Sequence, residues 1–356
     1  MNLYLSKKIK IASFFLIIQI VVLHGYNLVI HYHPGKYFVK DQFNFLLQNF
    51  ISDGICRIAV PLFFMISGYL YFINIQEQFQ LHHYLIKLKR RFHSVLIPFL
   101  VWSTMGVVAL FIMINIPELQ IFFYKYSIQN FAFPEIIDLW LVNPINYQLW
   151  FLQVLFLFCM ISPVFYLLVK AGKYAVFLLL PLLFVNFPYG FLLTVTIEGF
   201  LFFAMGAYLA LRPVNFQFIM SKKHLLLFFL TWIGLIAFKI YLHSRDLRTF
   251  SVHFEKLSML PGIVFFWFAL DYLYHYLRNM DFRASLFSYS FFIFLFHEPT
   301  LIIIKKLMLI ALGVNPMGNF ITYLLAPLFT IGLALIVAKS LKKYLPRIYL
   351  FLTGSR

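Results

Sequence analysis

The sequence is poor in charged residues. Lysine, arginine, aspartate and glutamate make up 12% of its 356 residues, whereas an ordinary soluble domain has about 25%. Acidic residues are scarcer than basic ones, with 12 Asp and Glu against 29 Lys and Arg. A soluble domain of this size needs a polar exterior, because its surface stays large relative to its volume. The shortage of charge therefore excludes a soluble enzyme.

Cysteine is also scarce, since the chain contains only Cys56 and Cys159. Two cysteines far apart in sequence give no disulfide framework, which excludes a secreted disulfide scaffold. The spacings of His, Cys and acidic residues form no ligand set, so we expect no metal site. No small-residue cleavage site follows the first apolar run, and we expect no cleavable signal peptide.

What the chain has in abundance is apolar surface. Hydrophobic residues make up 63% of the chain and aromatic residues 21%, including 47 Phe. Lipid must solvate most of these side chains, which predicts an all-α polytopic membrane helix bundle. A helix of roughly 20 residues crosses the hydrocarbon core. That length gives about ten candidate spans, at residues 11–30, 57–74, 94–115, 148–170, 174–190, 191–211, 224–242, 257–277, 286–304 and 318–340.

The net charge of +17 fits the topology of a membrane protein. With the N-terminus in the cytoplasm, ten spans place about two-thirds of the 29 basic residues on the cytoplasmic side. This bias predicts that both termini are cytoplasmic, and it disfavours fusing the fifth and sixth spans. We expect no nucleic-acid partner, since anionic membrane lipids explain the basic loops. We expect one membrane domain over residues 1–356 and no extracytoplasmic domain.

Ionisable residues inside spans are costly in lipid and are therefore candidates for function. His24 lies in the outer half of the first predicted span. His297 and Glu298 precede Pro299 in the ninth span, at a similar depth, and the proline frees backbone carbonyls there. We assign these three residues a catalytic role, because a neutral imidazole can act as a general base. The alternative is that they are structural groups buried between helices.

Four further residues are candidates for binding substrate, namely Arg57, Ser67, Trp150 and Glu198. Each has a plainer interpretation. Arg57 could extend its side chain to lipid headgroups, and the small Ser67 could permit close helix packing. Trp150 could be an aromatic anchor at the membrane interface, and Glu198 could pair with a basic group.

A basic cluster precedes the third span in the segment KLKRRFH, residues 87–93. We expect a cytoplasmic loop in which Lys87, Arg90 and Arg91 hold the phosphates of an anionic donor, because arginine forks match phosphate oxygens. The positive-inside rule alone also accounts for this cluster.

Several motifs resemble the integral-membrane acyltransferase-3 family, the bacterial enzymes that acylate surface glycans. The matching segments are LHGYN ending the first span, RIAVPLFFMISGYL at 57–70, KLKRRFHSVLIPFLVW at 87–102, QLWFL at 148–152 and FLFHEP at 294–299. The resemblance covers most of the chain and implies a ten-span core. By it, His24 matches the family's catalytic histidine, and Arg90 and Arg91 match its basic inner loop.

The resemblance implies an O-acyltransferase of the bacterial plasma membrane. Such an enzyme moves an acyl group, often acetyl, from cytosolic acyl-coenzyme A to a sugar hydroxyl of an exported or cell-surface polysaccharide. The expected partners are membrane lipids, the glycan acceptor and acyl-CoA as donor substrate, and we expect no permanently bound cofactor. The acyl group, the acceptor and the oligomeric state are not determined by the sequence.

The chain departs from the family at one position. Many members carry an arginine eleven residues before the histidine, where this sequence has Ser13. Arg57 or Glu298 are candidates to replace it. Two other functions stay open from the residues alone: a transporter or flippase for a glycan or lipid-linked sugar, and a structural membrane subunit.

Overall fold

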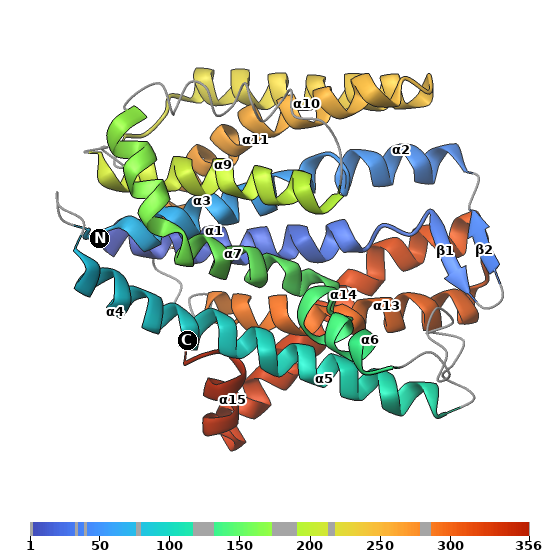
Figure 1. The fold of residues 1–356 in the computed structure, drawn as a ribbon. Helices are drawn as coiled ribbons and strands as arrows, with labels where there is room; N and C mark the ends of the chain where they lie inside the picture. The colour runs from blue at the N-terminus through green and yellow to red at the C-terminus, as the bar shows by residue number, and fades with distance from the viewer. Residues whose placement is uncertain are drawn as a thin grey trace. The chain divides into compact units, whose positions relative to one another are not determined.

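The computed structural model describes residues 3–32, 35–38, 41–75, 80–116, 132–172, 191–212, 218–277 and 286–355. These residues form mainly helices (Figure 1). In chain order, the helices are α1 (Leu3–His24), α2 (Gln42–Ile51), α3 (Ala59–Phe72), α4 (Leu81–Arg91), α5 (Ile97–Ile114), α6 (Phe133–Ile137), α7 (Trp150–Met160), α9 (Phe191–Leu211), α10 (Lys222–Ser244), α11 (Arg248–Leu277), α13 (Ser290–Leu312), α14 (Pro316–Tyr344) and α15 (Pro346–Leu352). Short three-ten or π-helical turns lie at Ile55–Ile58, Phe92–Leu96, Asp138–Val142 and Tyr147–Leu149.

One β-hairpin corrects the expectation of a purely α-helical fold. Strands β1 (Val29–Tyr32) and β2 (Gly35–Phe38) pair antiparallel, with Val29 opposite Phe38. The hairpin begins where the first predicted span was expected to end, so α1 stops at His24 instead of residue 30. The β-branched and aromatic residues of these two segments favour extended backbone over helix.

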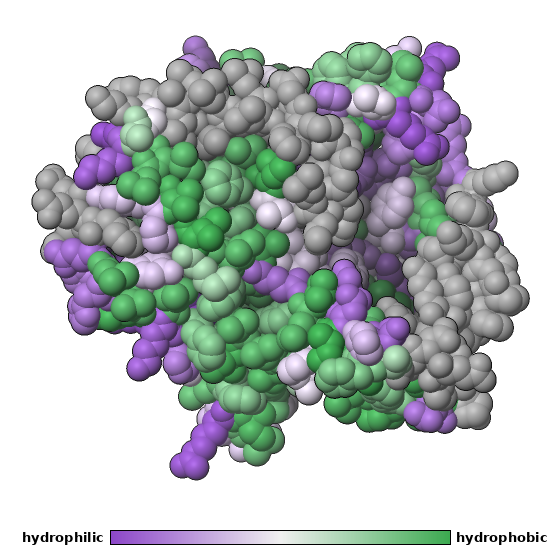
Figure 2. All heavy atoms as spheres, in the orientation of Figure 1, coloured by the Kyte–Doolittle hydropathy of each residue, from purple (hydrophilic) through white to green (hydrophobic). Residues whose placement is uncertain are grey.

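The helices confirm a polytopic membrane protein. Within the described residues, five helical segments are long and apolar enough to cross a bilayer. They are Gln42–Phe72, Leu81–Ile114, Lys222–Ser244, Arg248–Leu277 and Pro316–Tyr344. A sixth is gained if Phe133–Val142 and Tyr147–Met160, which meet at 62°, form one bent span. Hydrophobic side chains cover broad areas of the face shown in Figure 2, as expected of a surface in lipid.

Most predicted spans coincide with a helix. Helices α1, α3, α5, α9, α10, α11, α13 and α14 each cover most of one predicted range. The predicted span at residues 174–190 lies outside the described residues. The basic segment at 87–93 was expected to be a loop and is helical instead, because no glycine or proline interrupts the chain between Leu81 and Ile97. Helix α4 continues through a π-helical turn into α5.

The chain divides into two compact units. Unit 1 comprises residues 1–20, 49–89 and 157–288. Its helices α3 and α9 pack backbone against backbone at Gly68 and Gly206 (Figure 1). A Cβ atom at Gly68 would lie 2.2 Å from the carbonyl oxygen of Phe203, and one at Gly206 would lie 2.0 Å from that of Met65. Small residues are therefore required at this crossing.

A buried ion pair joins α1 to α11 within unit 1. The Lys8 ammonium pairs with the Asp271 carboxylate, and both side chains are almost wholly buried. The same ammonium lies 4.3 Å from the centre of the Trp267 ring. The pairing with Asp271 offsets part of the cost of burying the lysine.

Unit 2 comprises residues 21–48, 90–156 and 289–356. Helices α13 and α14 pack along each other in it (Figure 1). Helix α15 packs on α5, where the Trp102 indole N–H donates to the carbonyl oxygen of Leu352 at 3.1 Å. This unit also contains the last turn of α1 and the break in α13, and these two features place the site described next.

Candidate functional site

His24 is the last residue of α1, and the following glycine ends the helix. The Gly25 N–H donates to the carbonyl oxygens of Val21 and Val22, both at 3.0 Å. A Cβ atom at position 25 would lie 2.9 Å from the Val22 oxygen and 3.0 Å from Pro327 Cγ, so only glycine fits there. The imidazole of His24 is half-buried at this helix end.

His24 contacts His297 directly. A hydrogen bond of 3.0 Å joins His24 Nδ1 to His297 Nε2, although the two residues are 273 positions apart. Their rings stack with centroids 5.2 Å apart. His297 is fully buried, and its Nδ1 lies 2.7 Å from the carbonyl oxygen of Phe294. The two histidines therefore form a pair.

Helix α13 is broken directly after His297. Glu298 has non-helical backbone angles (φ −116°, ψ 135°) and Pro299 follows it. Proline has no N–H, so the Leu295 carbonyl lacks its usual helical partner. The Gln148 side-chain amide donates to this carbonyl and to that of Glu298, each at 3.2 Å. The freed backbone oxygens are thus satisfied by a side chain, as required in a membrane interior.

Two more polar side chains complete the surroundings of the pair. The Tyr147 ring centre lies 4.8 Å from that of His24, and its hydroxyl reaches Glu298 Oε1 at 3.5 Å. The Lys305 ammonium donates to the backbone oxygens of His24 at 2.7 Å and Tyr26 at 3.2 Å. Lys305 therefore caps the end of α1, where carbonyl groups have no helical partner.

A buried amide cluster fixes the chain just beyond His24. The Gln48 side chain accepts from the Asn27 backbone N–H at 2.9 Å and donates to the side-chain oxygens of Asn27 and Asn319 at 2.8 and 2.9 Å. Asn27 and Asn319 also exchange hydrogen bonds between side chain and backbone. All three side chains are at most 3% exposed. This cluster holds the chain after α1 to α2 and α14 and so limits the movement of His24.

The structure therefore brings together the three residues predicted to be catalytic. His24, His297 and Glu298 lie in unit 2, and the group that contacts His24 Nδ1 is His297. The Oε1 of Glu298 faces Tyr147, and its Oε2 is buried without a hydrogen-bond partner among the described residues.

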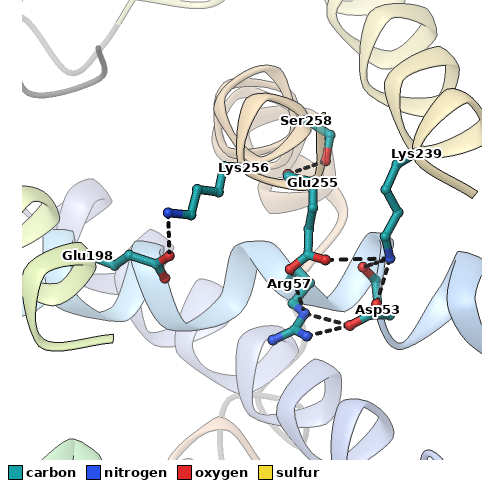
Figure 3. Close-up of polar contacts among 7 residues, drawn as sticks. All are labelled: Asp53, Arg57, Glu198, Lys239, Glu255, Lys256 and Ser258. Carbon is teal, nitrogen blue, oxygen red and sulfur yellow. Dashed lines mark hydrogen bonds and ion pairs between the residues drawn. The ribbon is translucent and has the colours of Figure 1, made fainter. Parts of the chain in front are cut away.

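Arg57 and Glu198 lie in unit 1, in a cluster of six charged side chains (Figure 3). We call Asp53, Arg57, Glu198, Lys239, Glu255 and Lys256 the charge cluster. Arg57 Nε lies 2.8 Å from Asp53 and 3.2 Å from Glu255. Lys239 Nζ lies 2.6 Å from Asp53 and 3.5 Å from Glu255. These four charges alternate in a closed ring, beside which Glu198 pairs with Lys256 at 3.7 Å.

The chain also matches the sequence profile of a known protein family. The profile, described as an acyltransferase domain, matches residues 9–339. The chain belongs to the acyltransferase-3 family. The succinoglycan biosynthesis protein ExoH of Rhizobium meliloti (strain 1021) is 27% identical over 376 aligned residues, which cover all of this chain and 94% of the relative. No solved structure matches the chain significantly.

The other two residues predicted to bind substrate, Ser67 and Trp150, are part of neither the histidine pair nor the charge cluster. Ser67 precedes Gly68 at the crossing of α3 and α9 and makes no hydrogen bond within the described part of the chain. The plainer interpretation, close helix packing, fits its position. Trp150 is half-buried and packs edge-on against Phe151 at 6.2 Å between centroids.

The basic residues of α4 differ in how far they are engaged. Lys87 Nζ donates to the carbonyl oxygens of Tyr71 at 2.6 Å and Ile73 at 3.2 Å, and so caps α3 within unit 1. Arg90 is exposed and Arg91 is half-buried. Arg90 is therefore better placed than Lys87 to meet a soluble anion.

Three residues at the histidine pair were not among the predicted site residues. Tyr147 and Gln148 lie two and three positions before Trp150, and Gln148 opens the motif QLWFL. Lys305 follows Glu298 by seven residues, a spacing that returns to the same face of a helix and could have indicated its role.

Proposed function

We propose that this acyltransferase moves an acyl group from a coenzyme A thioester to a hydroxyl group of an exported polysaccharide, with His24 as general base. The observation that supports this most is the 3.0 Å contact between His24 and His297 at the end of α1. The polysaccharide acceptor is supported by the relative named for succinoglycan biosynthesis.

The hydrogen bonds assign the protons of the pair. His297 Nδ1 faces the carbonyl oxygens of Phe294 and Ile293, which only accept, so this nitrogen carries the proton. His297 Nε2 in the neutral ring is then an acceptor, and His24 Nδ1 must donate to it. The lone pair of His24 is left on Nε2. A neutral imidazole with that lone pair is the form that a general base needs.

In the reaction, the acceptor hydroxyl oxygen attacks the thioester carbonyl while His24 Nε2 takes its proton. The carbon–oxygen bond forms, the carbon–sulfur bond breaks, and the proton passes from His24 to the departing thiolate. The imidazolium formed on the way keeps its Nδ1–H directed at His297 Nε2, which orients and stabilises it. Lys305 holds the backbone that carries His24.

The donor site is proposed at α4. Arg90 and Arg91 offer guanidinium forks to the coenzyme A phosphates, which supports a coenzyme A thioester as donor. We propose acetyl-CoA as that thioester. The enzyme needs no permanently bound cofactor, because a thioester is already activated for acyl transfer.

For topology, we propose one acyltransferase domain with ten spans and both termini in the cytoplasm of a bacterium, inserted in its plasma membrane. The support is the bias of basic residues toward one side of the predicted spans. This orientation puts the basic α4 on the side where coenzyme A thioesters are made.

The test replaces His24 with Ala at matched expression and measures ester-linked acyl groups on the exported polysaccharide. We expect them to be lost, whereas the control His224→Ala, at an exposed position of α10, keeps them. Unchanged acylation in H24A contradicts the assignment of the base. Transfer of label from acetyl-CoA to de-acylated polysaccharide by the purified protein excludes a function in transport alone.

A further inference from the structure

The charge cluster in unit 1 is electrically balanced. Its closed ring sets the cations Arg57 and Lys239 against the anions Asp53 and Glu255. The adjoining Glu198 and Lys256 balance each other. An anionic ligand would be attracted by the two cations of the ring but repelled by its two carboxylates. A cationic ligand would be attracted by the carboxylates and repelled by the cations. The cluster therefore favours an uncharged ligand over an ion.

The two cations of the ring differ in exposure, since Arg57 is accessible and Lys239 is buried. The Arg57 side chain is 40% exposed, whereas that of Lys239 is 2% exposed. Arg57 is also the midpoint of the apolar helical segment Gln42–Phe72. An arginine with that exposure does not face hydrocarbon, because ionisable residues in membrane segments face polar cavities or partners.

Arg57 has hydrogen-bond donors to spare. Its Nε and Nη2 are engaged by Asp53, and Nε also lies near Glu255. Its Nη1 has no acceptor among the described residues, and Figure 3 shows one terminal nitrogen on the side away from Asp53. Glu198 attracts Arg57 and contacts Lys256 through Oε1, which leaves Oε2 as a hydrogen-bond acceptor.

Donors and an acceptor presented together, without net charge, suit groups that both accept and donate. Vicinal hydroxyl groups of a sugar are of this kind. We propose that the charge cluster binds an uncharged sugar residue of the acceptor polysaccharide, with Arg57 Nη1 donating to one hydroxyl and Glu198 accepting from another. The inference rests on the proposed function and specifies where its acceptor is held and which sugars fit.

The decisive variant is Arg57→Lys, which keeps a positive charge for Asp53 and Glu255 but removes the Nη1 donors. Its matched control is Arg248→Lys, because Arg248 is 78% exposed and pairs only with the equally exposed Asp246 among the described residues. Thermal unfolding of both purified full-length proteins shows whether the fold is kept. Glu198→Gln is the second variant, since it keeps an acceptor oxygen and removes the charge.

The probes are oligosaccharides made from the host's own exported polysaccharide, de-esterified with mild base and separated by charge into neutral and acidic fractions. Binding is measured without an acyl donor. We expect the neutral fraction to bind the unaltered protein, Arg57→Lys to weaken that binding about tenfold, and Arg248→Lys to leave it unchanged. Glu198→Gln should weaken it less than tenfold. Binding of the acidic fraction alone, no binding of either, or full binding by Arg57→Lys would each overturn the proposal.

Steady-state kinetics separate this inference from the proposed function. Arg57→Lys should raise the KM for the oligosaccharide about tenfold and leave kcat and the KM for acetyl-CoA unchanged. If kcat falls while the oligosaccharide KM stays constant, Arg57 has a structural role and the inference fails, while the acyltransfer itself stands. If H24A still transfers acyl groups, the catalytic base fails, while the binding result stands.

Discussion

At the scale of single residues, the chemistry depends on where protons sit in the histidine pair. Two backbone carbonyls fix the proton on His297 Nδ1, which makes His297 Nε2 an acceptor. The hydrogen bond between the rings then places a proton on His24 Nδ1. In the proposed mechanism, His297 takes the orienting role that a carboxylate has in the Ser-His-Asp triad. A buried neutral partner achieves this without adding a second charge to the membrane interior.

Lys305 binds the backbone that carries His24, and the loss of Lys305 should slow catalysis. Lys305→Met removes two hydrogen bonds from a charged donor to the end of α1, each worth about 1.5–3 kcal/mol. We expect kcat to fall about tenfold to a hundredfold with little change in either KM, because the ammonium positions the backbone of His24. Kinetics with labelled acetyl-CoA measure this, with the exposed Lys339→Met of α14 as control. An unchanged kcat in Lys305→Met shows that α1 needs no cap there.

The sequence predicted the members of the histidine pair and missed their neighbours. His24, His297 and Glu298 stand out because an imidazole or carboxylate in an apolar run is costly. Gln148 and Lys305 do not stand out, since an amide at a span boundary and a lysine near a span end are common there. Their roles depend on contacts with helix ends that are distant in sequence. The cost of placing one polar side chain in lipid does not reveal such contacts.

At the scale of elements, the break in α13 and the Gln148 side chain form one structural unit. Gln148→Leu leaves the Leu295 and Glu298 carbonyls unpaired and should cost about 1–3 kcal/mol in unfolding free energy per group. Adding Pro299→Ala restores an N–H for the Leu295 carbonyl. The double variant should therefore lose less stability than the sum of the two single variants.

Thermal unfolding in detergent of the two single variants and the double variant measures this coupling. Strict additivity would show that Gln148 and Pro299 act independently. In that case the interrupted α13 would be stabilised by other contacts, and the account of Gln148 as the partner of the freed carbonyls would be wrong.

The crossing of α3 and α9 depends on the absence of side chains. Gly68→Ala and Gly206→Ala push a methyl group into opposing backbone and should each lower stability by about 1–3 kcal/mol. Gly234 in α10 and Gly332 in α14 have no atoms within 4 Å of an added Cβ. Their alanine variants are matched controls and should gain about 0.5–1 kcal/mol from helix propensity. Equal melting temperatures for all four variants would contradict the close packing of α3 on α9.

The positions of most helices follow well from the sequence, because apolar runs and their polar boundaries are local features. The helical ends do not. Helix α1 starts earlier and stops earlier than its hydropathy suggests, since Gly25 and the following strand residues end it. The basic segment before α5 is helical although its charge suggested a loop, because charge alone does not break a helix.

At the scale of the whole molecule, the proposed topology can be tested with protease-cleavable tags. Tags are placed at each terminus and between Asp246 and Leu247, in the turn from α10 to α11. With ten spans and cytoplasmic termini, protease added to intact spheroplasts should cut only the tag in the turn. Cleavage of one terminal tag would imply an odd number of spans and would overturn the proposed orientation.

The balance of charge has two different causes in this molecule. We attribute the excess of basic residues mainly to the proposed topology, whereas four of the 12 acidic residues are used in pairs inside the helix bundle. Asp53, Glu198, Glu255 and Asp271 all pair with buried or half-buried cations in unit 1. Composition predicts the membrane from the shortage of charge, but only tertiary structure shows which charges meet.

The most direct test of the account is a comparison of acyl transfer by H24A, H297A and the double variant, measured as kcat with labelled acetyl-CoA and de-acylated polysaccharide. If the two histidines act as one unit, H24A abolishes nearly all transfer and H297A lowers kcat about 10²–10³-fold. The double variant is then no slower than H24A. A wild-type kcat in either single variant, or losses that multiply in the double variant, would contradict a base at His24 oriented by His297.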